Sequence, residues 1–190
     1  LPGHGRSGGE PLKTVYEMAQ WVIEVLDAAG LTDAALVGHS LGSLVAVAAA
    51  ALHPQRIRAI ALIGTTVPMP VSDYLLERAR ENNHEAIEML TFWGFSKSAQ
   101  LGGNATPGNW MLGGGLRLME KAKPGVIHTD LVACNEYREG LEHAKMVECP
   151  ALLVLGERDM LTPVRSAMKL ADALPNAEKV VLKGSGHALL

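Results

Sequence analysis

Apolar residues recur at helical spacing in the first part of the chain, between Thr14 and Gly30. Thr14 opens a Thr-x-x-Glu capping box, in which its hydroxyl can accept a backbone N–H while Glu17 reaches back to Thr14. Gly30 supplies a C-terminal stop, because glycine readily adopts the left-handed conformation that ends helices. The pattern predicts a helix from residue 15 to the residues before Gly30. The repeat consists of Val15, Met18, Ala19, Val22 and Leu26.

Three short runs are apolar rather than alternating, at residues 34–38, 57–63 and 151–155, and residues 179–182 form a weaker fourth. Continuous apolar runs separated by helices are typical of parallel strands that helices cover on both faces. Residues 41–53, which follow the first run, are apolar nearly all round and rich in alanine, and end before Pro54. A helix of small residues can lie close to a sheet, and a following proline disfavours its continuation. Thr162 and Pro163 predict a cap and a first helical proline for another helix from Val164.

The region from Val67 to Glu148 breaks this rhythm, because its helical patterns have no strand between them. It contains Trp93, Trp110 and most of the methionines. We interpret residues 67–148 as a helical cap, and residues 1–66 and 149–190 as an α/β core with a parallel sheet flanked by helices. The apolar cap residues predict a substrate pocket for an apolar acyl group, although such residues often only pack a lid. The candidates are Trp93, Trp110 and Met111, with Leu112 and Met119.

Composition narrows the classes of protein. Of the 190 residues 48% are hydrophobic and 19% charged, with 17 Lys+Arg against 20 Asp+Glu, which suits one globular domain. The absence of a basic stripe argues against a nucleic-acid partner. The longest apolar stretch, Leu44 to Leu52, is far below the ~20 residues of a membrane span. Two cysteines cannot make a disulfide framework or a zinc site, and we expect a reducing compartment, the cytoplasm. We expect neither a metal nor a cofactor, and the oligomeric state stays open.

Gly38-His39-Ser40-Leu41-Gly42 fits G-x-S-x-G, between a predicted strand and a predicted helix. A nucleophile on such a tight turn has a strained backbone, and glycines on both sides would keep Cβ atoms from colliding. Ser40 is therefore the candidate nucleophile. The alternative is a glycine-rich turn without chemistry, which the strand before and the helix after make less favourable.

Serine needs a base, because its hydroxyl is a poor nucleophile at neutral pH. His187 follows the last apolar run in Gly-Ser-Gly-His and is the candidate. Asp159 follows the third run and can orient an imidazole, with Glu157 as its rival at the same exit. His39 neighbours Ser40, so its side chain points elsewhere and packing is its expected role. We expect the remaining candidates, His53, His84, His128 and His143, to be solvated.

These motifs resemble those of the α/β-hydrolase superfamily. Leu1 to Ser7 resembles its P-G-H-G-x-S loop, residues 38–42 its nucleophile elbow, and residues 156–159 and 186–187 its acid and histidine loops. The order Ser, Asp, His is the order of that class. The resemblance implies the last four strands of the core sheet and a helical cap inserted after the second of them. It also implies that the chain is truncated at both ends, lacking the first strands, one oxyanion donor and a final helix.

The resemblance implies hydrolysis of a carboxylic ester on a small molecule, with the backbone N–H of Leu41 as one oxyanion donor. Loss of the other donor typically costs ~10²–10³ in kcat, so we expect the isolated chain to be weakly active. Thioesterase, lactonase, carbon–carbon hydrolase and haloperoxidase-like chemistry use the same three side chains. An aspartate nucleophile, as in dehalogenases and epoxide hydrolases, is disfavoured because serine stands at position 40.

A non-catalytic ligand receptor on the same scaffold is an alternative from a different class, since fold does not determine function. Labelling by a fluorophosphonate, lost on Ser40→Ala, would favour the enzyme. A dinucleotide-binding domain is disfavoured, because residues 38–42 do not supply G-x-G-x-x-G.

Overall fold

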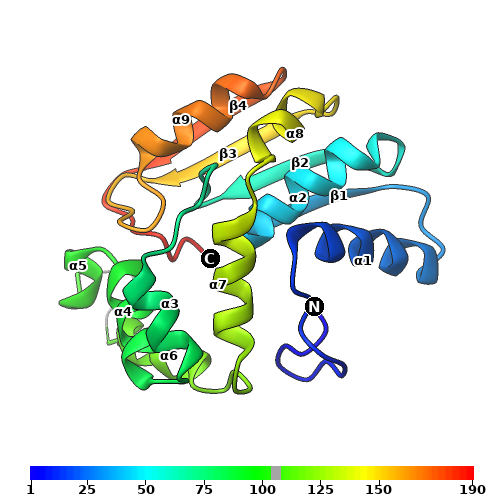
Figure 1. Cartoon of the computed structure of the whole chain (residues 1–190). Coiled ribbons are helices and arrows are strands. Elements are labelled where there is room, and N and C mark those ends of the chain that lie inside the picture. The colour runs from blue at the N-terminus through cyan, green and yellow to red at the C-terminus, as the bar shows by residue number, and fades with distance from the viewer. Residues whose placement is uncertain (104–107) are drawn as a thin grey trace.

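A computed structural model describes residues 1–103 and 108–190. Its core is a four-stranded sheet in the order β1-β2-β3-β4, in which every adjacent pair is parallel (Figure 1). The strands are β1 (Ala34–His39), β2 (Ile57–Ile63), β3 (Ala151–Gly156) and β4 (Ala177–Leu182). The predicted α/β fold, with a parallel sheet flanked by helices, is confirmed.

The helix α1 (Val15–Ala28) has the predicted N-terminal cap. The Thr14 hydroxyl accepts the backbone N–H of Glu17, and the Glu17 carboxylate accepts the backbone N–H of Thr14. Gly30 follows with a φ of 67°, as the stop signal predicted. Val15, Met18 and Ala19 are buried, and α1 packs on the helix α2.

The helix α2 (Leu41–Leu52) is the central element of the core, and its residues 43–51 are all buried. It contacts β1, β2, α1 and the helix α8. Seven of its twelve residues are alanine, glycine or serine, which lets the backbone lie close to the sheet. A single 3₁₀ turn, η1 (Pro54–Arg56), separates α2 from β2. This helix sets the position of the strand-to-helix turn at residue 40.

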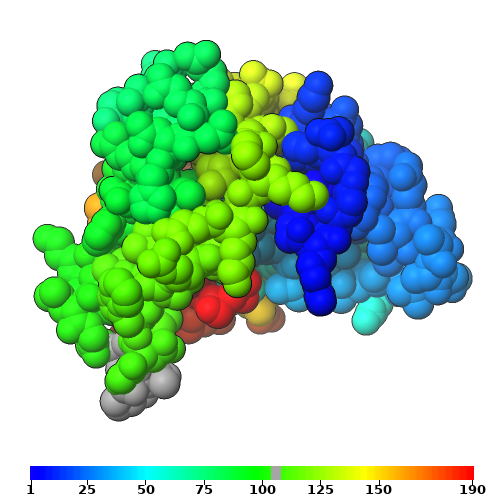
Figure 2. All heavy atoms as spheres, turned by 90° about the horizontal axis from the view of Figure 1, so that it is seen from below, coloured from blue at the N-terminus to red at the C-terminus, as the bar shows by residue number. Residues whose placement is uncertain are grey.

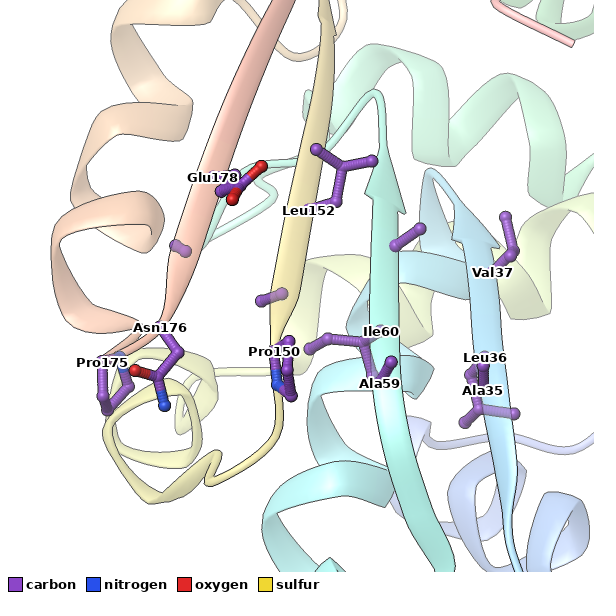
Figure 3. A pocket seen from close by; sticks show the side chains of 13 residues that line it. Ala35, Leu36, Val37, Ala59, Ile60, Pro150, Leu152, Pro175, Asn176 and Glu178 are labelled. Atoms are coloured by element: carbon purple, nitrogen blue, oxygen red, sulfur yellow. The ribbon is translucent and has the colours of Figure 1, made fainter.

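The two faces of the sheet differ. On the face toward α2, Leu62, Leu153 and Leu155 are fully buried. On the opposite face Val37 is 70% exposed, and a cavity of about 760 Å³ lies along all four strands (Figure 3). The expectation of helices over both faces is therefore wrong for the described residues. The cause is that helices α1, α2, α8 and α9 lie together on one side of the sheet (Figure 1).

Between β2 and β3 the described residues form helices only, as the pattern predicted; residues 104–107 lie outside the described part. A small separate core, centred on Leu75, Ala79 and Ala86, holds part of this region together. The division into core and cap itself stays a prediction. The helices are α3 (Asp73–Arg80), α4 (His84–Gly94), α5 (Lys97–Gln100), α6 (Met111–Met119), α7 (Val126–Glu136) and α8 (Gly140–Met146).

The helix α9 (Val164–Ala173) follows β3 and packs against β3, β4 and α8. Its N-cap is Pro163, and Thr162 does not cap it. The predicted capping role of Thr162 is wrong because its hydroxyl donates to Asp159 instead. Within residues 1–103 and 108–190, none of the helices combines the length and the hydropathy of a membrane span.

Candidate active site

Parallel strands bring their carboxyl ends to one edge of the sheet, where ligands of such sheets usually bind. Ser40 directly follows β1, Asp159 lies three residues after β3, and His187 lies in the segment after β4. Two backbone hydrogen bonds hold that segment: Arg158 N–H donates to the Ser185 carbonyl, and Ala188 N–H donates to the Gly94 carbonyl. The His187 segment thus lies against the β3 exit on one side and α4 on the other.

Ser40 stands on a strained turn, with φ 53° and ψ −120°. It is one of two non-glycine residues with positive φ among those described, and such strain is common at functional sites. A Cβ on Gly38 would lie 2.0 Å from the carbonyl oxygen of Gly42, so only glycine fits there. Gly42 itself has open space where a Cβ would point. The expectation that both glycines prevent collisions therefore holds for Gly38 alone.

Asp159 and His187 form a buried pair. The Nδ1 of His187 lies 2.8 Å from Oδ2 of Asp159, and the two residues are each 5% exposed. Since a carboxylate accepts hydrogen bonds, Nδ1 carries the proton and the neutral ring keeps a lone pair on Nε2. This is the tautomer that a general base for a serine hydroxyl needs.

Thr162 completes the surroundings of the Asp159 carboxylate. Its hydroxyl donates to Oδ2 at 2.7 Å, and the backbone N–H groups of Leu161 and Thr162 donate to Oδ1 at 2.8 and 2.7 Å. Burial alone would raise the pKa of Asp159, but the His187 interaction and the Thr162 donors outweigh it and hold that pKa below its usual value. The carboxylate is therefore ionised and fixed in orientation. Sequence reasoning missed Thr162, because its cap-like context suggested a helix start.

Ser40 and His187 line the same cavity of about 570 Å³, between the sheet edge and helices α4 and α6. As the first residue of α2, Leu41 has no acceptor for its N–H within the helix, and this N–H belongs to the positive end of the helix dipole. The structure thus brings Ser40, Leu41, Asp159 and His187 to one edge of the sheet. It leaves Glu157 out, because its carboxylate accepts the backbone N–H of Gly184 at 2.8 Å.

His39 is a second residue whose part the sequence did not reveal. Its Nε2–H donates to the backbone carbonyl of His187 at 2.8 Å, and the two rings lie 4.7 Å apart between centroids. Burial lowers the pKa of His39, with the nearby charge of Asp159 and the His187 carbonyl opposing that shift. A neutral His39 thus holds the backbone of His187. The motif places His39 next to Ser40, but its contact lies 148 positions away in the chain.

Some of the predicted pocket residues line a cavity at Ser40 and others do not. Met111 and Met119 line the 570 Å³ cavity, whereas Trp93 lines a second cavity of about 260 Å³ that also reaches Ser40. Trp110 lines neither cavity; it is 68% exposed and its ring packs over Gly113. Leu112 is buried and lines neither cavity. Trp110 lies outside the cavities because it immediately precedes α6 and its ring lies over Gly113 in the first turn of that helix.

Among the residues that the structure describes, the other ionisable groups give no competing site. His143 is buried and hydrogen-bonded to the Tyr137 hydroxyl at 2.6 Å, so the expectation that it is solvated is wrong. Burial raises the pKa of the Cys134 thiol to about 12, which keeps it protonated. No group of three or more His, Cys, Asp or Glu residues in the described part of the chain could hold a metal ion.

The cavity on the exposed face of the sheet is larger, but its chemistry is poorer. It is lined mostly by aliphatic residues and prolines, and Glu178 is the one ionisable residue in its lining (Figure 3). A carboxylate without a partner nucleophile or histidine cannot perform the acid–base work that Ser40 and His187 can. We therefore place the candidate active site at the carboxyl edge of the strands.

Comparison with known proteins agrees with this geometry. Residues 1–109 match the family model described as alpha/beta hydrolase fold, and residues 132–190 match the model of TAP-like proteins. The chain is 27% identical to the "Putative carbamate hydrolase RutD" of Pseudomonas savastanoi pv. phaseolicola, covering 92% of this chain and 68% of that protein. The chain thus spans about two thirds of the length of its curated relatives.

Solved structures of enzymes show the same architecture. A thermophilic esterase superposes with a TM-score of 0.82 at 27% identity, covering 100% of this chain and 71% of that one. Est816, described as an N-acyl homoserine lactone degrading enzyme, superposes with a TM-score of 0.80 at 24% identity, covering 98% and 73%.

Proposed function

Because this chain belongs to the α/β-hydrolase family, we propose that it is a serine hydrolase that cleaves carboxylic esters through an acyl-enzyme on Ser40. The observation that carries the proposal is the 2.8 Å contact of His187 Nδ1 with Asp159 Oδ2, beside a cavity that His187 shares with Ser40. A carboxylate that holds Nδ1–H directs the basic Nε2 toward the substrate side.

In the first step the Ser40 oxygen attacks the ester carbonyl carbon while its proton passes to Nε2 of His187. The buried carboxylate of Asp159 stabilises the imidazolium that forms. The carbonyl oxygen becomes an oxyanion, and the Leu41 N–H at the start of α2 stabilises its charge. When the carbonyl re-forms, the bond to the alcohol oxygen breaks and His187 returns the proton to that oxygen.

In the second step a water molecule replaces the alcohol. His187 takes a proton from this water, whose oxygen bonds to the acyl carbon. The bond between that carbon and Ser40 then breaks, and the proton passes from His187 to the serine oxygen. The products are a carboxylic acid and an alcohol, and the enzyme is unchanged.

The helical region takes the role of a cap in this proposal. Residues 67–148 form the cap, and residues 1–66 and 149–190 form the core that carries the three catalytic side chains. Support comes from the residues that line the two cavities at Ser40, which derive mostly from positions 69–119 and from Leu131 and Cys134. The cap would therefore select the substrate while the core performs the chemistry.

Carbamates are a second candidate substrate class, because the curated relatives are named for carbamate hydrolysis. A carbamate has nitrogen on its carbonyl carbon, which favours polar walls around the acyl side. The 260 Å³ cavity beside Ser40 is instead lined largely by side chains such as Met69, Val71 and Leu75. Apolar walls favour an ester of an apolar acid.

The test is covalent labelling together with turnover. We expect a fluorophosphonate to label the wild type and p-nitrophenyl esters to be cleaved, whereas Ser40→Ala abolishes labelling and lowers kcat by roughly 10⁵–10⁶-fold. Ser72→Ala is the matched control, since Ser72 is the other serine that lines a cavity at this site. Labelling that survives in Ser40→Ala and disappears in Ser72→Ala would refute the role of Ser40. If the protein hydrolyses carbamates but not esters, carbamates replace esters as the proposed substrate class.

A further inference from the structure

Two cavities meet at the candidate nucleophile. Ser40, Leu90 and Leu161 line both of them, so the two spaces adjoin at the serine with two leucines between them. The smaller cavity, of about 260 Å³, extends beneath α3, α4 and α7. The larger cavity, of about 570 Å³, extends beneath α4 and α6 toward the end of the chain. A substrate whose reacting carbon sits at Ser40 therefore has a place for a substituent on either side.

His187 distinguishes the two cavities, because it lines the larger one and not the smaller one. The general acid must lie within hydrogen-bond reach of the oxygen that it protonates. The same ring must then activate the water that replaces the alcohol. The leaving group and the incoming water therefore occupy the side of Ser40 that His187 faces, and the acyl group occupies the other side.

We propose that the 260 Å³ cavity binds the acyl group of the ester and that the 570 Å³ cavity binds the leaving alcohol, an assignment that rests on the proposed function. During the reaction the bond from the Ser40 oxygen to the acyl carbon forms and the bond from that carbon to the alcohol oxygen breaks. The proton moves from Ser40 through His187 to the alcohol, which leaves the larger cavity. The acyl group stays in the smaller cavity until water releases it.

The chemistry of the smaller cavity defines the acyl group. Among the described residues that line it none is charged, and the one ionisable side chain, Cys134, is a neutral thiol. Its volume lies below the ~300–1,000 Å³ typical of cavities for whole ligands, which suits one half of a molecule. The acyl group is therefore uncharged, apolar and of limited length. Most of the wall is apolar, with Met69, Val71, Leu75 and Trp93, and the hydroxyls of Ser72 and Thr162 lie in the same wall.

The larger cavity accepts a larger alcohol. Its wall contains the polar residues His39 and Thr91 beside the apolar Phe95, Met111 and Leu118. Water must also enter here for the second step, because His187 lines this cavity. A bulky alcohol with an aromatic or aliphatic part suits this side, because the cavity is the larger of the two and most of its wall is apolar.

Two exposed side chains allow a matched test. Met160 is 58% exposed and lines only the smaller cavity, whereas Leu118 is 72% exposed and lines only the larger one. Because both are exposed, replacement by tryptophan narrows a cavity with little loss of core packing. Met160→Trp is the acyl-side variant and Leu118→Trp the alcohol-side control. Met160→Ala, which widens the smaller cavity, serves as the second acyl-side variant.

The measurement uses two ester series. One varies the acid, from p-nitrophenyl acetate to octanoate, and the other varies the alcohol, from methyl to naphthyl acetate. We expect Met160→Trp to lower kcat/KM for the octanoate relative to the acetate about tenfold and to leave the alcohol series unchanged. Leu118→Trp should lower kcat/KM for naphthyl acetate relative to methyl acetate and leave the acid series unchanged. Met160→Ala should raise kcat/KM for esters of longer acids relative to the acetate.

The outcomes separate this assignment from the function beneath it. If Ser40 is labelled and esters are cleaved, but the two tryptophan variants exchange their effects or change both series alike, the assignment of the cavities is overturned. If wild-type Ser40 resists the fluorophosphonate and no ester is cleaved, the proposed function itself fails. The expected pattern, with each variant confined to its own series, supports both.

Discussion

The Asp159 carboxylate accepts four hydrogen bonds, from Leu161 N–H, Thr162 N–H, the Thr162 hydroxyl and His187 Nδ1. Satisfying both oxygens offsets the cost of burying a charge. It also leaves the carboxylate one orientation, which determines the ring orientation of His187. At the scale of single residues, the site therefore depends on groups that do not touch substrate.

His39 gives a prediction at the same scale. Because burial lowers its pKa, folded His39 stays neutral at a pH where an unfolded histidine, with a pKa of about 6.5, already binds a proton. As the pH falls, the unfolded state thus binds more protons than the folded state. The free energy of unfolding of the wild type therefore decreases relative to that of His39→Gln. The loss is at most about 1.4 kcal/mol per pH unit.

Urea denaturation of wild type and His39→Gln between pH 8 and pH 5 measures this difference. Asp159 and His187 face the His39 ring in both proteins, so their own titration largely cancels in the comparison. A stability difference that stays constant over this range, or that grows in favour of the wild type toward low pH, would contradict a buried neutral His39.

At the scale of elements, the ends of strands determine where the histidine ring can lie. Gly64 directly follows β2 with a φ of 55°, and a Cβ there would lie 3.0 Å from Nδ1 of His187 and 3.4 Å from Nε2 of His39. The end of β2 thus forms the floor under both rings. At this edge of the sheet the backbone at Gly64 therefore packs directly against the two histidine rings.

Gly64→Ala is therefore expected to impair catalysis beyond its effect on stability. Both Gly64→Ala and Gly184→Ala place a side chain at positive φ, which costs about 1–2 kcal/mol. Gly184 has a φ of 72° but open space where the Cβ would point, so it serves as the control. We expect similar losses of Tm, with kcat/KM reduced at least tenfold only in Gly64→Ala. Equal activity in the two folded variants would show that the contact with His187 is tolerated.

At the scale of the whole molecule, the N-terminal segment lies beside the helical region (Figure 2). Nε2 of His4 lies 2.8 Å from Oδ2 of Asp130 in α7, and Nδ1 of His4 lies 2.8 Å from the Pro2 carbonyl. Because a carbonyl can only accept, Nδ1 carries a proton, and the contact with Asp130 needs one further proton between the two groups. This contact joins residues 126 positions apart.

Substitution of Asp130 tests how much its contact with His4 contributes to the free energy of unfolding. Asp130→Ala is expected to lower the free energy of unfolding by about 1–3 kcal/mol, because the half-buried His4 ring loses its hydrogen-bond partner. Asp130→Asn should lose less, since its amide can donate to a neutral His4. Arg80→Ala, which breaks a surface pair with Glu77, should change little. Thermal and urea denaturation measure all three, and equal losses in Asp130→Ala and Arg80→Ala would show that the contact contributes nothing.

The sequence by itself determined what depends on neighbours in the chain. The capping box at Thr14, the apolar runs of the strands and the order of Ser40, Asp159 and His187 all rest on local periodicity or spacing. Local hydrogen bonds and side-chain periods are properties of a short segment, so a short segment reveals them.

Only the tertiary structure decided which side chains meet. The contacts of His39 with His187 and of Gly64 with both rings join separate elements, and no local pattern encodes them. For the same reason the chain pattern could not show that Trp110 lies outside the cavities or that helices cover one face of the sheet. Such contacts depend on the packing of whole elements, because the direction of a side chain in space follows from the element that carries it.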